Sequence, residues 1–230
     1  MKTIGLLGGM SWESTVSYYK TINQGVKARL GGLHSAKILL YSVDFQEVES
    51  LMRQGRWDAI ADLLAQEARR IEAAGADFLL ICTNTMHIVF SRIEAAVDIP
   101  LLHIADAAAE AIQSKGWKKV GLLGTAATMV EPFYKDRLLQ KYGIGTVVPE
   151  PDDRRIVHSV IFNELCLGKI ENQSRTEYLR IIRHLEGQGA EAVILGCTEI
   201  AMLVGPDHTA VPLLDTAEIH ADQAVEMALT

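Results

Sequence analysis

Three cysteines are the residues of this chain best suited to nucleophilic or proton-transfer chemistry. They are Cys82, Cys166 and Cys197, an odd number at wide spacings, which fits neither a disulfide framework nor a paired C-x-x-C metal site. Reduced thiols are therefore expected. Cys197 lies in the run VILGCTEI, between an apolar strand-like segment and a predicted helix. Because a helix N-terminus lowers the pKa of a thiol, Cys197 is predicted to be a reactive thiolate, and a buried structural cysteine is the alternative.

The other two cysteines lie in less suggestive surroundings. Cys82 falls inside the apolar run LLICTNT and is predicted to point into the core, whereas Cys166 lies in the helical segment IFNELCLG. After Cys82 the run ends in three compact polar residues, Thr83, Asn84 and Thr85. Helix capping accounts for one of them but hardly for three, so these residues are expected to border a binding site.

Two glycine-containing turns follow predicted strands and precede predicted helices. In GLLGGMSWEST, the backbone N–H groups of Gly8–Gly9 and the hydroxyls of Ser11 and Thr15 could converge on an anion such as a carboxylate. An ordinary strand-to-helix turn is the equal alternative. GLLGTAATM has the same form, with Thr125 and Thr128 near the helix start, and helix capping is its simplest interpretation. Neither turn carries a complete phosphate-binding or dinucleotide-binding signature.

The elements that must position these residues alternate between short apolar runs and amphipathic stretches such as Trp57–Ala73. This alternation predicts an α/β fold with mainly parallel sheets flanked by helices. The clearest predicted strands are Thr3–Leu7, Lys37–Ser42, Phe78–Ile81, Val120–Leu123 and Ala192–Leu195.

An internal repeat divides the chain. GLLGG at residues 5–9 recurs as GLLGT at residues 121–125, and LLICTNT is echoed by VILGCTE at nearly the same separation. We therefore expect two pseudo-symmetric domains, the first formed by residues 1–99 plus 208–230 and the second by residues 100–207. The strand-and-helix tail after residue 208 would complete the first half. The carboxyl ends of the strands would face a shared cleft that holds the active site.

Composition excludes several classes of protein. The net charge of −7 is spread without a basic block, which argues against a nucleic-acid partner. The apolar segment near the N-terminus is too short for a signal peptide and no segment approaches a membrane span, so a cytoplasmic protein without a membrane partner is expected. Seven scattered histidines form no metal-binding motif, and His87 and His220 fall near predicted helix starts.

Taken together, GLLGGM, TNT-x-H, GLLGT-x-x-T, GCTEI and D-T-x-x-I-H resemble the aspartate/glutamate racemase family, in particular its L-aspartate/glutamate-specific members. The resemblance spans essentially the whole chain. It implies an amino-acid racemase that works without pyridoxal phosphate or any other cofactor, acts on a small-molecule amino acid, and forms a homodimer.

The resemblance also implies a catalytic pair. The usual member carries one cysteine before Asn-Thr and another before Thr-Glu, on opposite sides of the substrate Cα. Here Cys197 fills the second place, but Thr83 fills the first, with Cys82 one position too early. Adjacent strand residues point to opposite faces, so Cys82 is not expected to replace the missing thiol. A Thr83/Cys197 pair implies that Cys197 deprotonates L-glutamate or L-aspartate and that the L enantiomer is preferred.

Further site residues follow from the matching positions. Arg53 and Arg56 are candidates for recognising the side-chain carboxylate, and the choice between aspartate and glutamate stays open. The expected substrate contacts are Gly9, Met10, Ser11, Asn84, Thr85, Thr125, Thr128 and Thr198.

Two other functions compete with racemisation. An arylmalonate-type decarboxylase also works with a lone cysteine, but it needs an apolar pocket, whereas the loops here are rich in hydroxyl groups. A non-catalytic amino-acid-binding homologue would keep the site and lack turnover. A cysteine-dependent hydrolase is weaker, because no histidine motif pairs with Cys197.

Overall fold

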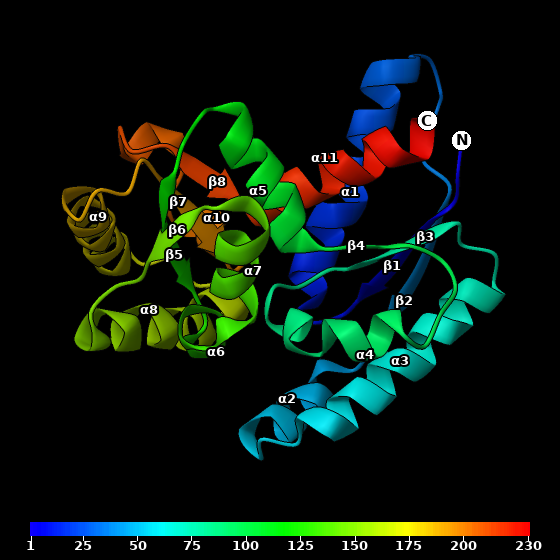
Figure 1. Ribbon diagram of the computed structural model, residues 1–230, viewed down its shortest axis with the longest axis horizontal. Helices are drawn as coiled ribbons and strands as arrows, with labels where there is room; N and C mark the ends of the chain where they lie inside the picture. Colours follow the sequence, from blue (N-terminus) through cyan, green and yellow to red (C-terminus); the bar gives the residue numbers. More distant parts are fainter. The chain divides into compact units, whose positions relative to one another are not determined.

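The computed structural model describes residues 1–230 and separates the chain into two compact units. The first comprises Met1–Ile104 and Ala217–Thr230, and the second comprises Ala105–Thr216. Each unit holds one sheet of four parallel strands flanked by helices (Figure 1). The strand orders, β2-β1-β3-β4 and β6-β5-β7-β8, follow the same pattern. This repetition confirms the predicted α/β class with two similar halves.

The first unit is built around strands that are almost entirely buried. All five residues of β1 and all four of β3 are buried, as expected of central parallel strands covered on both faces. None of the helices in the protein has the length and apolar character needed to cross a bilayer. The elements of this unit are β1 (Ile4–Gly8), α1 (Trp12–Leu30), β2 (Ile38–Ser42), α2 (Phe45–Arg53), α3 (Trp57–Ala73), β3 (Phe78–Ile81), η1 (Thr85–Val89), α4 (Phe90–Glu94), β4 (Leu101–Leu102) and α11 (Thr216–Leu229).

Alternate residues of β3 face two separate hydrophobic clusters. Leu79 and Ile81 pack in the cluster that contains Ile60 and Leu64 of α3. Phe78, Leu80 and Cys82 lie in the other cluster with side chains of α1 and α11, and these two helices run beside one another in Figure 1. This period of two is the geometric consequence of an extended backbone.

The second unit repeats this arrangement around β5 and β7. One cluster of its core joins Leu123 and Leu195 of the sheet to Tyr178 of α9 and Val157 of α8, and the Tyr178 hydroxyl donates to the Val157 carbonyl at 2.8 Å. The elements are α5 (Ile104–Ser114), β5 (Lys119–Gly124), α6 (Ala126–Val130), α7 (Pro132–Tyr142), β6 (Gly145–Val147), α8 (Pro151–Asn163), η2 (Leu165–Leu167), α9 (Asn172–Gly187), β7 (Ala192–Gly196), α10 (Ile200–Leu203), η3 (Pro206–His208) and β8 (Leu213–Asp215).

The division of the chain differs from the predicted one at both crossings. Strand β4 pairs with β3 and belongs to the first sheet, so the first segment runs to Ile104 and not to residue 99. Strand β8 pairs with β7, so only helix α11, and not the strand before it, returns to the first unit. In both cases a short strand pairs with the edge of the preceding sheet, where it covers backbone groups that would otherwise be unpaired.

Cys82 lies in the core, as predicted. Its exposed fraction is 0%, and its neighbours in the cluster include Leu80, Tyr18 and Ala221. The Cys82 N–H donates to the Leu7 carbonyl at 2.9 Å, which continues the ladder between β1 and β3 by one residue. Burial without a charged partner raises the pKa of the Cys82 thiol far above its ordinary value. This thiol stays protonated in the folded protein.

The turn after β1 requires glycine at position 9. Gly9 has φ +91°, in the region that favours glycine, and an added Cβ would lie 2.4 Å from the Val43 carbonyl oxygen. The backbone of Val43 is itself held, because its N–H donates to the Gly8 carbonyl at 3.0 Å. The first turn is therefore fixed by contact between two backbone segments.

Replacing Gly9 by alanine should destabilise the protein by about 2–4 kcal/mol, since it adds left-handed strain to a backbone clash. The matched control is Gly55→Ala, because Gly55 has φ +67° but an added Cβ there meets nothing within 4 Å. That variant should lose only about 1–2 kcal/mol. Urea denaturation of both variants measures the difference, and equal losses would show that the contact with Val43 has no cost.

Stability should depend on the Cys82 thiol at alkaline pH. The folded-state pKa is raised above the unfolded value, so the native chain keeps a proton that the unfolded chain loses, and stability falls as pH rises past about 9. Cys82→Ala should be less stable at neutral pH because it leaves a cavity. Its free energy of unfolding should nevertheless fall less than that of the wild type between about pH 8.5 and 10.5, by about 2 kcal/mol. Parallel curves in denaturant titrations across this range would contradict the assignment.

Candidate functional site

The two sheets place Thr83 and Cys197 at equivalent positions. In the first unit Leu7 pairs with Ile81, and in the second Leu123 pairs with Leu195. Thr83 lies two residues beyond Ile81, just as Cys197 lies two residues beyond Leu195, so each residue follows the carboxyl end of a central strand. Both are half-buried. The register therefore supports the alignment of Thr83 with Cys197 and leaves Cys82 aligned with Gly196.

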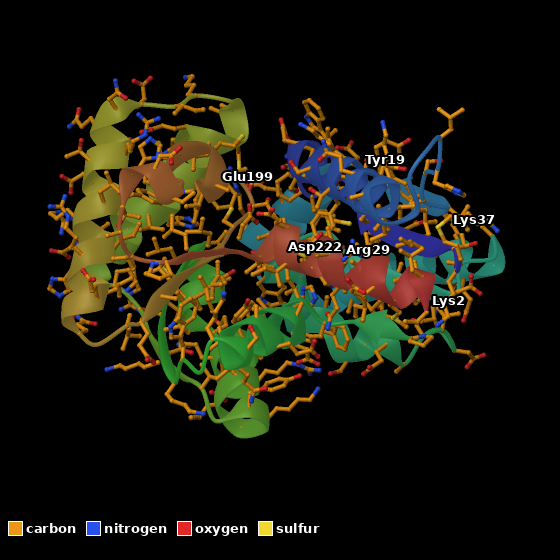
Figure 2. The ribbon with its side chains drawn as sticks, turned by 90° about the horizontal axis from the view of Figure 1, so that it is seen from above. Lys2, Tyr19, Arg29, Lys37, Glu199 and Asp222 are labelled. Atoms are coloured by element: carbon orange, nitrogen blue, oxygen red, sulfur yellow. The ribbon has the colours of Figure 1, made fainter.

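A carboxylate lies directly beside Cys197. The Cys197 Sγ donates to Glu199 Oε2 at 2.8 Å, and the Thr198 hydroxyl donates to the same oxygen at 2.9 Å. Glu199 is buried, with 5% of its surface exposed, immediately before α10 (labelled in Figure 2). Glu199 belongs to the GCTEI motif, where its type and spacing indicated no role, and Thr198 was predicted to contact the substrate. The Thr198 hydroxyl orients Glu199, and its contact with substrate stays a prediction.

The surroundings of Cys197 do not favour the predicted thiolate. Burial raises the pKa of the Cys197 thiol well above its ordinary value, and the neighbouring Glu199 carboxylate raises it further. Helix α10, which was expected to stabilise a thiolate, is a single turn that begins only at Ile200. Its weak dipole does not offset the adjacent carboxylate. Cys197 therefore rests as a thiol that donates a hydrogen bond.

Glycines at the strand ends bring the second-unit residues close together. Gly124 pairs with Gly196, and an added Cβ on Gly196 would lie 2.8 Å from the Leu123 carbonyl oxygen and 3.2 Å from the Thr128 methyl group. Thr128 is fully buried against these glycines. Close packing at this point restricts where the chain can place Cys197, the next residue.

Thr125 and Thr128 form a capping pair at the start of α6. The Thr128 N–H donates to the Thr125 hydroxyl oxygen at 3.3 Å, and the two hydroxyls are 3.2 Å apart. Capping, the simplest interpretation of this motif, is confirmed. His158 joins the same turn, since the Ala126 N–H donates to its Nδ1 at 3.1 Å. Burial lowers the pKa of His158, and no sequence motif marked this residue.

The residues after β3 are held by His87. Its Nδ1 lies 2.8 Å from the Thr83 carbonyl oxygen, and its Nε2 accepts from the Ile104 N–H at 3.2 Å. A carbonyl can only accept, so Nδ1 carries the hydrogen and the ring is neutral. His87 is buried, as are Asn84 and Thr85, whose predicted place at the strand end is observed. His87 therefore positions the backbone of Thr83.

His220 has a similar structural role within the first unit. Its Nδ1 accepts from the Tyr18 hydroxyl at 2.9 Å, and its Nε2 lies 3.1 Å from the Leu102 carbonyl oxygen. The residue is fully buried, so it is a core histidine that ties α11 to α1 and β4. No group of three or more His, Cys, Asp or Glu side chains is placed to hold a metal ion.

Polar groups of the turn at Gly8–Gly9 form hydrogen bonds with one another and with the start of α1. The Gly9 N–H donates to the Thr15 hydroxyl oxygen at 2.8 Å, and that hydroxyl donates to the Ser11 carbonyl at 2.9 Å. Ser11 caps α1, since the Ser14 N–H donates to its hydroxyl oxygen at 3.4 Å. The strand-to-helix turn is thus the better of the two interpretations. The Gly9 N–H is already used within the turn, which argues against the predicted anion-binding site.

Three other predicted contacts lie in less suitable places. The Met10 side chain is buried in a hydrophobic cluster, so only its backbone can meet a substrate. Arg53 is exposed and ion-paired with Glu49, and Arg56 is exposed just before α3. Neither arginine is held toward the strand ends by a described contact.

A cavity of about 350 Å³ opens on the surface of the first unit. Its lining contains no charged side chain, and Trp12, Val16 and Tyr19 along one face of α1 are more than half exposed. Such a lining does not suit a dicarboxylic amino acid, which needs cationic or hydrogen-bonding partners. The residues that line it are Trp12, Thr15, Val16, Tyr19, Leu40 and Ser42.

Comparison with known proteins gives one consistent result. A model of the Asp/Glu/hydantoin racemase family matches residues 7–224. A Yersinia pestis protein assigned as an Asp/Glu racemase is 53% identical, with a TM-score of 0.94 and 100% of both chains covered. An aspartate racemase homologue from Pyrococcus horikoshii OT3 is 34% identical, with a TM-score of 0.87 and the same coverage. The broad specificity amino-acid racemase RacX of Bacillus subtilis (strain 168) is 23% identical over 231 residues, 98% of each chain.

These matches include both sheets and the strand ends that carry Thr83 and Cys197. They confirm the resemblance drawn from the motifs. The chain belongs to the Asp/Glu/hydantoin racemase family.

Proposed function

We propose that this chain racemises an acidic amino acid, L-glutamate or L-aspartate, without a cofactor and with Cys197 as the base for the L enantiomer. The observation that carries the proposal is the position of Cys197, directly after the end of the central strand β7 and hydrogen-bonded to a buried carboxylate. Membership of a racemase family supports the reaction class. Relatives named for aspartate and glutamate support an acidic substrate.

The proposed reaction moves one proton off Cα and one proton on. Cys197 sulfur takes the Cα proton, and the electron pair of the broken C–H bond moves into the α-carboxylate to form an enediolate. The Thr83 hydroxyl, directly or through water, gives a proton to Cα from the opposite side, and water restores the hydroxyl. The net change is inversion at Cα, with no electron gained or lost.

Threonine in place of a second cysteine makes the two directions unequal. A threonine hydroxyl is far less acidic than a thiol, so it serves as a proton donor through water but is a poor base. The D enantiomer presents its Cα hydrogen to this poor base. Since the two enantiomers of a racemisation are equally stable, the preference for L concerns rates and saturation only.

The proposed substrate contacts are the polar groups at the strand ends. In the first unit these are Asn84 and Thr85, together with Ser11 at the start of α1. In the second unit Thr125 and Thr128 act as one hydrogen-bonded pair. Their hydroxyl and amide groups offer donors and acceptors to two carboxylates and one ammonium group.

Cys197→Ala should abolish loss of the Cα proton. In deuterated water, proton NMR of L-glutamate and of L-aspartate should show exchange of the Cα hydrogen with wild-type enzyme and a rate at least about 10³-fold lower with the variant. Cys82→Ala is the matched control, since it removes a thiol that lies in the core, and it should retain exchange under conditions where it is folded. Amino-acid binding without exchange by the wild type would favour the non-catalytic alternative. Carbon dioxide release from aryl malonates would favour the decarboxylase.

Thr83→Ala should separate exchange from inversion. Cys197 can still remove and return the proton on one side, so deuterium should enter L-glutamate while the yield of D-glutamate per exchange event falls at least about ten-fold. Thr83→Ser keeps the hydroxyl and should behave like the wild type. Chiral chromatography and NMR on the same samples give the ratio. A parallel loss of both activities, or wild-type exchange as fast from the D as from the L enantiomer at matched subsaturating concentrations, would refute a role for Thr83 as the weak partner.

A further inference from the structure

Helix α1 carries an apolar stripe that the rest of the chain leaves uncovered. Trp12, Val16 and Tyr19 are 64%, 53% and 53% exposed, and spacings of four and three residues place them along one side of the helix. Tyr19 is labelled in Figure 2. Another side of α1 is buried, since Tyr18 and Ile22 pack in the hydrophobic cluster that includes α11. The stripe is therefore a second apolar surface of α1 and not part of the core.

The exposed surface continues onto β2, the outermost strand of the first sheet. One edge of β2 has no neighbouring strand, and its sequence, ILLYS, holds no charge or proline to prevent pairing with another chain. Leu40 of β2 is 46% exposed and lines the same cavity as Trp12 and Tyr19. These two rings alone leave about 250 Å² in contact with water. An apolar patch of a few hundred Å² marks a surface that binds another molecule.

We propose that this α1 face, formed by Trp12, Val16, Tyr19 and Leu40, is the surface on which a second copy of the same chain docks about a two-fold axis. A two-fold axis brings the same patch of both copies together, so the patch must be complementary to itself. Apolar side chains meet this condition in any orientation, whereas charged side chains meet it in only one.

Glu13 and Lys20 supply this self-complementarity. They are seven residues apart, so both project from the same side of α1, about 10 Å apart along its axis and beside the stripe. Neither side chain takes part in an ion pair within the chain. When two copies of α1 pack antiparallel and cross near Val16, Glu13 faces Lys20 of the partner subunit, and the reverse pair forms by symmetry. The two helix dipoles are also opposed in this arrangement.

Other occupants fit these charges less well. A helix that lies on a membrane surface carries basic residues beside its apolar face, whereas Glu13 would face the lipid head groups here. A small apolar ligand in the cavity would leave the free edge of β2 uncovered. A second copy covers the apolar stripe and pairs both charges.

Charge reversal tests the proposal in the full chain. Glu13→Lys and Lys20→Glu should each weaken the dimer at least about five-fold, because each turns two symmetry-related attractions into repulsions. An equal mixture of the two variants should regain the wild-type affinity, since each copy then meets opposite charges on the other. Sedimentation equilibrium over about 0.1–100 µM gives the dissociation constants. Glu13 and Lys20 of one chain are too far apart to pair, so recovery in the mixture reports contact between copies.

A charge placed within the stripe gives a second test. Val16→Asp should weaken the dimer at least about 100-fold, because the carboxylate would be buried against apolar side chains. Val130→Asp is the matched control, since Val130 is also a helical valine, 51% exposed at the end of α6 in the second unit, and it should leave the affinity unchanged. Far-UV circular dichroism confirms that each variant is folded.

Several outcomes would overturn the proposal. A wild type that stays monomeric at about 100 µM has no such interface, and binding of that monomer to phosphatidylcholine vesicles would assign the α1 face to lipid. A dimer that survives Val16→Asp uses another surface. Charge reversals without effect, or a mixture that does not recover, would refute the antiparallel arrangement. These masses are measured without substrate, so they stand apart from any result on racemisation.

Discussion

The hydrogen bond from the Cys197 thiol to the Glu199 carboxylate is the interaction on which the proposed chemistry of the second unit depends. A half-buried thiol next to a carboxylate is a poor nucleophile toward solvent reagents, because loss of water and the negative charge of Glu199 both oppose ionisation of the sulfur. The same arrangement suits a base that must act on a weakly acidic carbon, since a sulfur that holds protons firmly also takes them readily. Low resting reactivity and proton affinity are two results of one contact.

The first unit supplies the same framework with a different residue at the equivalent position. Both sheets have the same strand order, and the register that places Cys197 beyond β7 places Thr83 beyond β3. The supporting contacts differ, however. Cys197 has a carboxylate on its side chain, whereas Thr83 is held through its backbone carbonyl by a neutral His87. The Cys197 thiol therefore has a carboxylate as its hydrogen-bond acceptor, whereas no acceptor is described for the Thr83 hydroxyl.

Much of the fold could be predicted from the sequence, because central parallel strands are continuous apolar runs. The five predicted strands agree with the structure to within one residue at each end, and helix α3 agrees at both ends. The two-residue and three-residue strands β4 and β6 have no such run and were missed. The crossing points were misplaced for a related reason, since nothing in the local pattern tells which sheet will pair with β8.

The strand-end positions of the candidate residues could be predicted from the sequence, but their electrostatic surroundings could not. Strand periodicity was enough to place Cys82 in the core, because alternation depends on the backbone alone. The pKa of Cys197 depends on burial and on the orientation of a side chain two residues along, which no spacing rule encodes. The same limit applies to Thr198, whose hydroxyl is oriented toward Glu199.

Glycine and threonine at the strand ends explain why each unit holds the residue after its central strand in a fixed place. In the first unit the Thr15 side chain packs so close to Gly8 that an added Cβ on Gly8 would lie 2.5 Å from it. In the second unit Thr128 packs against Gly124, where an added Cβ would lie 3.1 Å from the Thr128 side chain. These contacts leave each strand end little room to move, because interiors are close-packed. The strand cannot shift its register by one residue, so Cys82 stays in the core and does not reach the position that Thr83 occupies. In the proposed reaction, the contribution of each half is therefore limited to the single residue that its packed strand end holds in place, Thr83 in the first unit and Cys197 in the second.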